Sequence, residues 1–180
     1  MTARAGAGPL RHLVVLRHAK SAWPDGVTDH ERPLAPRGRR DAPAAGRALA
    51  DAGLLPGLAL CSTAVRARQT WELASAQWAT PPPVRLDARL YGAGVPELLD
   101  VLRAVPAEVD TLLLVGHNPG LEDLVLDLAG DGLDDTLDEV RRKFPTSAIA
   151  LLAWRGTDWR DLAPGAALLT NVLVARGQRR

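Results

Sequence analysis

The chain has 180 residues, 47% of them hydrophobic and 24% charged, which suits one globular domain with a single sizeable core. Its formal net charge of +1 excludes a global field that would attract nucleic acid or an anionic membrane. The single cysteine, Cys61, excludes an internal disulfide and a multi-cysteine metal site, and it fits a reducing cytoplasm. We therefore expect a cytoplasmic protein that binds neither nucleic acid nor membrane.

The first ten residues are mostly small, with glycine, proline and one arginine. We expect a flexible tail over residues 1–10 and a single domain over residues 11–180, because no internal repeat or linker-like stretch divides the remainder. The first apolar run, residues 13–16, is too short for the core of a signal peptide and far too short to span a membrane.

Apolar runs alternate with helix-like segments along the rest of the chain. In order, we predict a strand at 12–16, a helix at 36–52, a strand at 58–61, a helix at about 64–78, a strand at 84–86, a helix at 96–104, a strand at 111–115, a helix after Pro119, and strands at 148–154 and 168–175. Nearly continuous apolar strands separated by helices are typical of a mainly parallel sheet covered on both faces. The sequence thus predicts a three-layer α/β/α domain.

Cationic side chains follow three of the predicted strands. Arg17 and His18 come directly after the first strand, Arg66 lies in the first turn of the helix after the second, and His117 follows the strand at 111–115. In mainly parallel sheets, ligands bind outside the carboxyl ends of the strands, so these residues are expected to converge. Two arginines and two histidines near a helix N-terminus suit a small dianion, and a phosphoryl group is the obvious candidate.

The same three places resemble the motifs of the histidine phosphatase superfamily, which has the phosphoglycerate mutase-like fold. Arg17-His18 resembles the Arg-His hallmark after the first strand. Residues 62–70 (STAVRARQT) resemble the second motif, in which Arg66 stands four residues after a serine and precedes Gln-Thr. Residues 116–118 (GHN) resemble the third motif and supply His117 as the second active-site histidine.

A narrower resemblance is to the SixA-type phosphohistidine phosphatases. It rests on residues 17–21 (RHAKS), with Asp29, residues 32–34 (RPL) and residues 37–38 (RG) downstream, and the likeness covers nearly the whole chain from about His12. The resemblance implies that His18 is the nucleophile and forms a phosphohistidine intermediate that water hydrolyses. It also implies that the phosphoryl oxygens are held by side chains alone, without metal or organic cofactor; the residues concerned are Arg17, Arg66 and His117.

The motifs lack a proton donor. Asn118 follows His117 where acid-phosphatase relatives place an aspartate, and neither Asp87 nor Glu97 matches the glutamate of the phosphoglycerate mutase branch. An alkyl phosphate needs a general acid, whereas a phosphohistidine can leave as neutral imidazole after protonation of its own ring. The leading prediction is therefore a phosphatase acting on phosphohistidine in a protein. The alternatives are a small-molecule phosphomonoesterase on the same scaffold and a non-catalytic module that binds phosphorylated ligands.

Other readings of the same residues are weaker. Cys61 and Arg66 have one residue too few between them for the Cys-x5-Arg loop of cysteine-dependent phosphatases. A metal site built from the two histidines would lack carboxylates. His12 and His30 fit no motif and are expected to be structural or at the surface, while Trp23 could wall the site or simply pack. The other four tryptophans are expected in the core: Trp71, Trp78, Trp154 and Trp159. The sequence leaves the physiological substrate, the oligomeric state and the pathway open.

Overall fold

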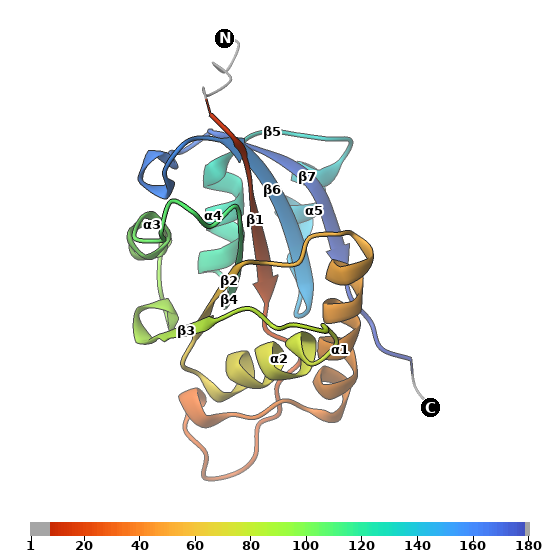
Figure 1. Cartoon of the computed structure of the whole chain (residues 1–180). Coiled ribbons are helices and arrows are strands. Elements are labelled where there is room, and N and C mark those ends of the chain that lie inside the picture. Colours follow the sequence, from red (N-terminus) through yellow and green to blue (C-terminus); the bar gives the residue numbers. More distant parts are fainter. Residues whose placement is uncertain (1–7, 179–180) are drawn as a thin grey trace.

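The computed structural model describes residues 8–178, and its centre is one seven-stranded mixed sheet in the order β3-β2-β4-β1-β6-β7-β5 (Figure 1). Four of its six strand pairs are parallel, and the two that involve β6 with β1 and with β7 are antiparallel. The strands are β1 (Leu10–Arg17), β2 (Leu58–Ser62), β3 (Val84–Asp87), β4 (Thr111–Gly116), β5 (Ala129–Gly132), β6 (Ala148–Arg155) and β7 (Ala167–Val174).

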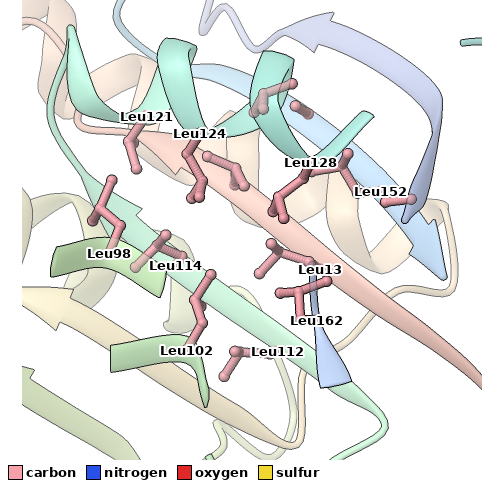
Figure 2. Close-up of a cluster of buried hydrophobic side chains, with 14 of the residues drawn as sticks. Leu13, Leu98, Leu102, Leu112, Leu114, Leu121, Leu124, Leu128, Leu152 and Leu162 are labelled. Atoms are coloured by element: carbon pink, nitrogen blue, oxygen red, sulfur yellow. The ribbon is translucent and has the colours of Figure 1, made fainter. Parts of the chain in front are cut away.

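Helices cover both faces of the sheet. Their bounds are α1 (Pro36–Asp51), α2 (Val65–Ser75), α3 (Val95–Arg103), α4 (Gly120–Leu128) and α5 (Thr136–Arg142). Side chains alternate along β1, so Leu13 and Val15 join one hydrophobic cluster with α3, α4 and α5, whereas Val14 and Leu16 join another with α1 and α2. Figure 2 shows the first cluster, which is dominated by leucines from α3, α4, β1 and β4. The predicted three-layer α/β/α fold is confirmed.

The elements appear in the predicted order, with differences at their ends. Strand β1 begins at Leu10, inside the stretch predicted as a tail, and residues 1–7 of that tail lie outside the described residues. Helix α2 ends at Ser75 rather than near Trp78, because the chain turns there and the buried indole of Trp78 donates a 2.8 Å hydrogen bond to the Gly46 carbonyl. Of the tryptophans expected in the core, all four are buried.

Strand β5, helix α5 and three short helices were not predicted from the sequence. Strand β5 has the sequence AGDG, which shows no alternation of apolar and polar residues. Helix α5 has seven residues, of which five are polar or charged and two, a leucine and a valine, are apolar. Three 3₁₀ helices complete the fold: η1 (Asp29–Glu31), η2 (Ala88–Leu90) and η3 (Trp159–Asp161). No helix among the described residues is both long and apolar enough to cross a membrane.

The sheet brings three strand ends together. Strand β4 lies between β2 and β1 and is parallel to both, with Arg17 opposite Gly116 and Cys61 opposite Val115. The carboxyl ends of the three strands therefore lie level with one another. This arrangement places the chain segments after β1, β2 and β4 at one edge of the sheet, as the sequence predicts.

Candidate active site

His18 follows β1 directly and is 7% exposed. Its backbone N–H donates to the Gly116 carbonyl at 3.0 Å, and its ring Nδ1 lies 2.7 Å from the Ala19 carbonyl oxygen. Because a carbonyl can only accept, Nδ1 carries the ring proton and Nε2 keeps its lone pair. Burial lowers the pKa of His18 to about 3; the hydrogen bond to the Ala19 carbonyl opposes this shift, and the charges of Arg66 and Arg17 add to it. The side chain is thus a neutral imidazole whose Nε2 can act as a nucleophile at neutral pH.

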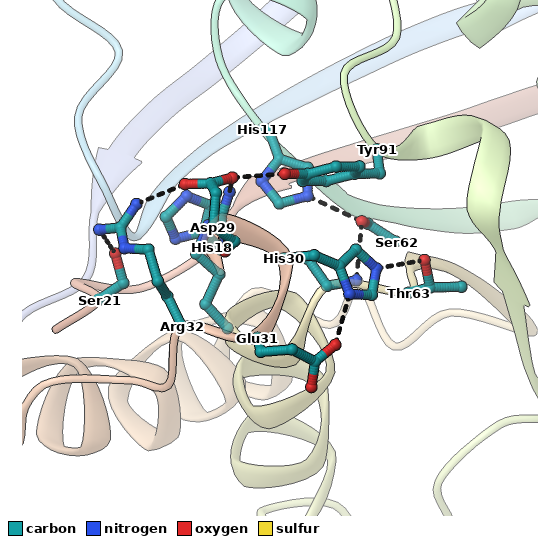
Figure 3. Close-up of polar contacts among 12 residues, drawn as sticks. His18, Ser21, Asp29, His30, Glu31, Arg32, Ser62, Thr63, Tyr91 and His117 are labelled. Atoms are coloured by element: carbon teal, nitrogen blue, oxygen red, sulfur yellow. Dashed lines mark hydrogen bonds and ion pairs between the residues drawn. The ribbon is translucent and has the colours of Figure 1, made fainter. Parts of the chain in front are cut away.

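His117 comes from the end of β4 and faces His18, with 5.1 Å between the ring centroids (Figure 3). Its Nε2 lies 2.8 Å from the Ser62 hydroxyl, and its ring meets the Tyr91 ring edge-on at 5.6 Å. The pKa of His117 is lowered to about 4, mainly by burial and to a smaller extent by the charge of Arg66. Nδ1 of this ring is buried and has no hydrogen-bond partner within residues 8–178.

Arg66 is the second residue of α2 and is buried beside these rings. One guanidinium nitrogen donates to the Asp29 backbone carbonyl at 2.6 Å, and another donates to the Asp29 carboxylate at 3.1 Å. The guanidinium carbon lies 5.9 Å from the centre of the Tyr91 ring. Arg66 is therefore fixed in place by η1, a segment that precedes it by more than thirty residues.

The Asp29 carboxylate is the centre of a second layer of polar contacts. It accepts from the Tyr91 hydroxyl at 2.5 Å and from Arg32 at 3.0 Å, in addition to Arg66 (Figure 3). These donors, with Tyr91 first, hold the pKa of Asp29 well below its usual range. Asp29 is consequently an anion at neutral pH, and it can orient Arg66 but cannot donate a proton as a general acid.

Arg17 stands at the last position of β1 and is half-buried. It donates to the Phe144 carbonyl at 2.9 Å, and burial lowers its pKa while the charge of Glu122 opposes that shift. The Asn118 amide donates to the same carbonyl at 2.9 Å and to Glu122 at 3.1 Å. An ionised aspartate in place of Asn118 could not make these bonds, so this position holds the loop after α5 rather than a proton donor.

The two carboxylates considered in the sequence have other partners. Asp87 is bound by Arg89 at 2.6 Å, and Glu97 accepts from the Gly94 backbone N–H at 3.0 Å at the start of α3. Two carboxylates remain near the site. Asp29 is ionised and binds Arg66, and Glu122 accepts from the Asn118 amide while its charge acts on Arg17. Burial raises the pKa of the Cys61 thiol to about 12, so it cannot supply a thiolate at neutral pH.

The structure brings together His18, His117 and Arg66, and it places the charge of Arg17 close enough to lower the pKa of both histidines. Sequence reasoning missed the contacts of Tyr91. His30, expected to be structural or at the surface, has a side chain that is 35% exposed, and its ring lies 4.9 Å from the Tyr91 ring and 3.0 Å from the Thr63 hydroxyl. Neither Tyr91 nor His30 belongs to a motif that would have identified it from the sequence. Asp29 and Ser62 both occur in the motifs that carry the family resemblance, but the sequence analysis assigned neither of them a function in the site.

Trp23 is 73% exposed, so it does not belong to the core. The Arg32 guanidinium carbon lies 3.2 Å from the centre of its ring, in a stacking contact. As to metals, residues 8–178 contain no group of three or more histidine, cysteine, aspartate or glutamate side chains placed to hold an ion. His18, His117 and Arg66 can thus supply a neutral nitrogen nucleophile and fixed hydrogen-bond donors, which are the groups that a phosphoryl-transfer site needs.

Comparisons with known proteins agree with this chemistry. The model of the histidine phosphatase superfamily (branch 1) matches residues 13–96. An uncharacterized protein of Mycobacterium tuberculosis is 46% identical over 165 residues, covering 89% of this chain and all of that protein. The solved structure of a candidate phosphohistidine phosphatase SixA from Nakamurella multipartitia has 36% identity and a TM-score of 0.82, covering 93% of this chain and 98% of its own. The structure of another candidate phosphohistidine phosphatase SixA, from Agrobacterium tumefaciens, has 30% identity and a TM-score of 0.77. The match covers 91% of this chain and 97% of that one.

Proposed function

The chain belongs to the histidine phosphatase superfamily, in its SixA-type group, and from this premise we propose that it is a phosphatase that removes the phosphoryl group from phosphohistidine on a protein. One observation carries the proposal: a neutral His18 with a free Nε2 lies against His117 and Arg66, while the carboxylate bound to that arginine is ionised. The site thus combines a nucleophile and cationic donors, and the carboxylate that holds Arg66 is not a proton donor.

The first half of the reaction transfers the phosphoryl group to the enzyme. Nε2 of His18 attacks phosphorus in line, and the bond from phosphorus to the leaving nitrogen breaks as the new P–N bond forms. The departing imidazole takes a proton on its own ring and leaves neutral. Guanidinium and imidazole donors stabilise the charge on the three phosphoryl oxygens, and the residues that supply them are Arg17, Arg66 and His117.

Hydrolysis of the intermediate completes the cycle. Water attacks phosphorus, the bond to Nε2 of His18 breaks, and inorganic phosphate leaves. The hydrogen bond from Nδ1 to the Ala19 carbonyl keeps the ring in one orientation through both steps. Asp29 keeps Arg66 in position from behind, since its backbone oxygen and its carboxylate bind different nitrogens of the guanidinium.

The two positions where relatives carry a proton donor have no matching carboxylate here, and this sets the proposed substrate preference. General acid catalysis is worth roughly 10²–10⁴ in rate, and a sugar phosphate leaving as an alkoxide would forgo it at this site. A phosphohistidine needs no such help, because its ring carries its own proton site. We also propose a cytoplasmic enzyme that works without nucleic acid or membrane, on the ground of its low net charge and single buried cysteine.

A substrate panel tests the proposal. We expect kcat/KM on a phosphohistidine carrier protein to exceed that on sugar, nucleotide and glycerate phosphates by at least about tenfold. If a monoester is preferred, and if Asp87→Asn or Glu97→Gln removes that activity, a general acid exists and a small-molecule phosphomonoesterase is the better description. Lack of turnover on every compound, an activated phosphoester included, would indicate a non-catalytic binding module.

Trapping the intermediate tests the mechanism separately. Rapid quenching should yield an acid-labile, base-stable label on His18, and ³¹P spectroscopy should place it on Nε2, because Nδ1 is bound to the Ala19 carbonyl. His18→Ala should abolish both label and turnover while circular dichroism shows a folded protein. A label on Nδ1 would contradict the assigned ring orientation, and a label on Cys61 or Ser62 would contradict the nucleophile.

A further inference from the structure

A hollow of about 260 Å³ lies beside the candidate active site. We call it the cationic hollow, because five of its seven lining residues are lysine or arginine; the seven are Arg17, Lys20, Arg37, Lys143, Pro145, Thr146 and Arg176. They come from the end of β1 and the loop after it, from the start of α1, from the loop after α5, and from the chain after β7. Chain segments far apart in sequence therefore contribute positive charge to one place.

Two carboxylates offset part of this positive charge: Glu122 acts on Arg17, and Asp41 pairs with Arg37 and Arg176. Asp41 lies 3.3 Å from both Arg37 and Arg176, and its side chain is 2% exposed, so it sits beneath the hollow rather than in it. Within the described part of the chain, neither Lys20 nor Lys143 has an ion-pair partner within 4 Å, and both are exposed. Since the whole molecule has a formal net charge of only +1, this is a local concentration of charge at the surface.

The cationic hollow and the phosphoryl site share Arg17. The residue after it is the nucleophile His18, and Lys20 follows two positions later, so a ligand group in the hollow lies next to the transferred phosphoryl group. Lys20, Arg37, Lys143 and Arg176 are all exposed. Such an open site with long side chains suits groups displayed on another protein's surface more than a small molecule, which binds in a largely enclosed pocket.

From this arrangement we propose that the cationic hollow binds acidic side chains that flank the phosphohistidine of the substrate protein. The inference rests on the proposed function and names the substrate more narrowly. On a helix, residues three and four positions away from the phosphohistidine lie about 5–6 Å from it on the same face. Carboxylates at those positions would reach the hollow while the phosphoryl group faces His18.

The test uses phosphohistidine peptides that differ only in charge. One carries glutamates at three positions around the phosphohistidine, and a second carries glutamines there. Exposed ion pairs are individually weak, so three of them should favour the glutamate peptide by about tenfold in kcat/KM. The preference should shrink at 1 M salt, where the Debye length is only about 3 Å.

Variants locate the effect. Lys20→Gln with Lys143→Gln should bring the ratio of the two kcat/KM values close to one, and Lys20→Glu with Lys143→Glu should instead favour a third peptide that carries lysines. Arg160→Gln is the matched control, because Arg160 is an exposed arginine on η3 outside the hollow, and it should keep the wild-type ratio. Taking ratios within each variant cancels any change in folded fraction.

The outcomes separate the inference from the function beneath it. Equal, efficient hydrolysis of both peptides would overturn the acidic-flank inference and leave the phosphohistidine phosphatase standing. Hydrolysis of neither peptide, with turnover of a monoester, would overturn both. If the peptides are equivalent but pyrophosphate inhibits far better than phosphate, and only with both lysines present, the hollow takes a second phosphate of a small molecule and the inference is wrong.

Discussion

Burial controls the chemistry of the two site histidines at the residue scale. Both rings are drawn out of water beside two guanidinium groups, and each of these effects disfavours the imidazolium. His18 and His117 are therefore neutral at neutral pH, although an anionic ligand is expected between them. The arginines supply the permanent positive charge, and the histidines supply a lone pair and directed N–H groups.

The lowered pKa of His18 predicts how stability depends on pH. An unfolded chain binds a proton at this ring below its ordinary pKa of about 6.5, whereas the folded chain does so only near 3. The contribution is thus lost as pH falls between these values, by about 2 kcal/mol at pH 5 for this one group. We expect Tm to drop from pH 7 to pH 5 and His18→Gln to make that drop smaller, as calorimetry can check. An unchanged pH dependence in the variant would contradict the buried neutral ring.

Two arginines of the second motif provide a matched pair. Arg66 is buried beside His117, while Arg68 donates to the Thr63 carbonyl at 3.1 Å and points elsewhere, because two residues on a helix are separated by about 200°. Arg66→Ala should cost about 3 kcal/mol of transition-state stabilisation, roughly 10²-fold in kcat/KM. Arg68→Ala should stay within a few-fold of wild type in the same assay. Equal losses would show that the register of the motif is misassigned.

At the scale of elements, α1 positions the loop that follows the nucleophile. A Cβ added to Gly38 would lie 2.1 Å from the Lys20 carbonyl oxygen, and this oxygen also accepts from the Ala35 N–H at 2.8 Å. A Cβ added to Gly46, two turns along the helix, would lie 2.1 Å from the Ala74 carbonyl oxygen of α2. The first contact fixes the site, and the second fixes one helix against another.

Substituting the two glycines separates these roles. Gly38→Ala and Gly46→Ala should each destabilise the fold by about 1–3 kcal/mol, since backbone must move to admit the methyl group. Only Gly38→Ala should also lower kcat/KM by about tenfold or more, because small displacements of catalytic groups are costly. Denaturant unfolding and kinetics on folded protein measure the two effects. A fully active Gly38→Ala enzyme would mean that the loop after His18 is not held by α1.

At the scale of the whole molecule, the site is assembled from strand ends on a sheet that is covered on both faces, and its cations are side chains. We expect activity to survive exhaustive chelation within twofold. Saturating phosphate should raise Tm, since a ligand at 100 times its Kd stabilises the fold by about 2.7 kcal/mol. For a chain of this size that corresponds to roughly 5–10 °C. Arg66→Ala should lose most of this shift, and activity restored only by one divalent ion would contradict the side-chain clamp.

Local patterns in the sequence were enough for the order of the main elements and for part of the site. Apolar strands such as 58–61 and 111–115 are recognisable in isolation, and the geometry of parallel strands then places Arg17, His18 and His117 at one edge of the sheet. Strand β5 and helix α5 were not predicted, because AGDG and a short charged segment show no hydrophobic periodicity. Their positions depend on packing against β7 and α4.

Only the tertiary structure decided the contacts that give these residues their chemistry. Asp29 reaches Arg66 across 37 positions, Tyr91 reaches Asp29 across 62, and Ser62 reaches His117 across 55. The ring proton of His18, the lowered pKa values and the cationic hollow likewise arise from burial and from segments that meet in space. Periodicity and spacing describe neighbours along the chain, whereas protonation state and anion affinity depend on the dielectric surroundings and charges that folding assembles from distant positions.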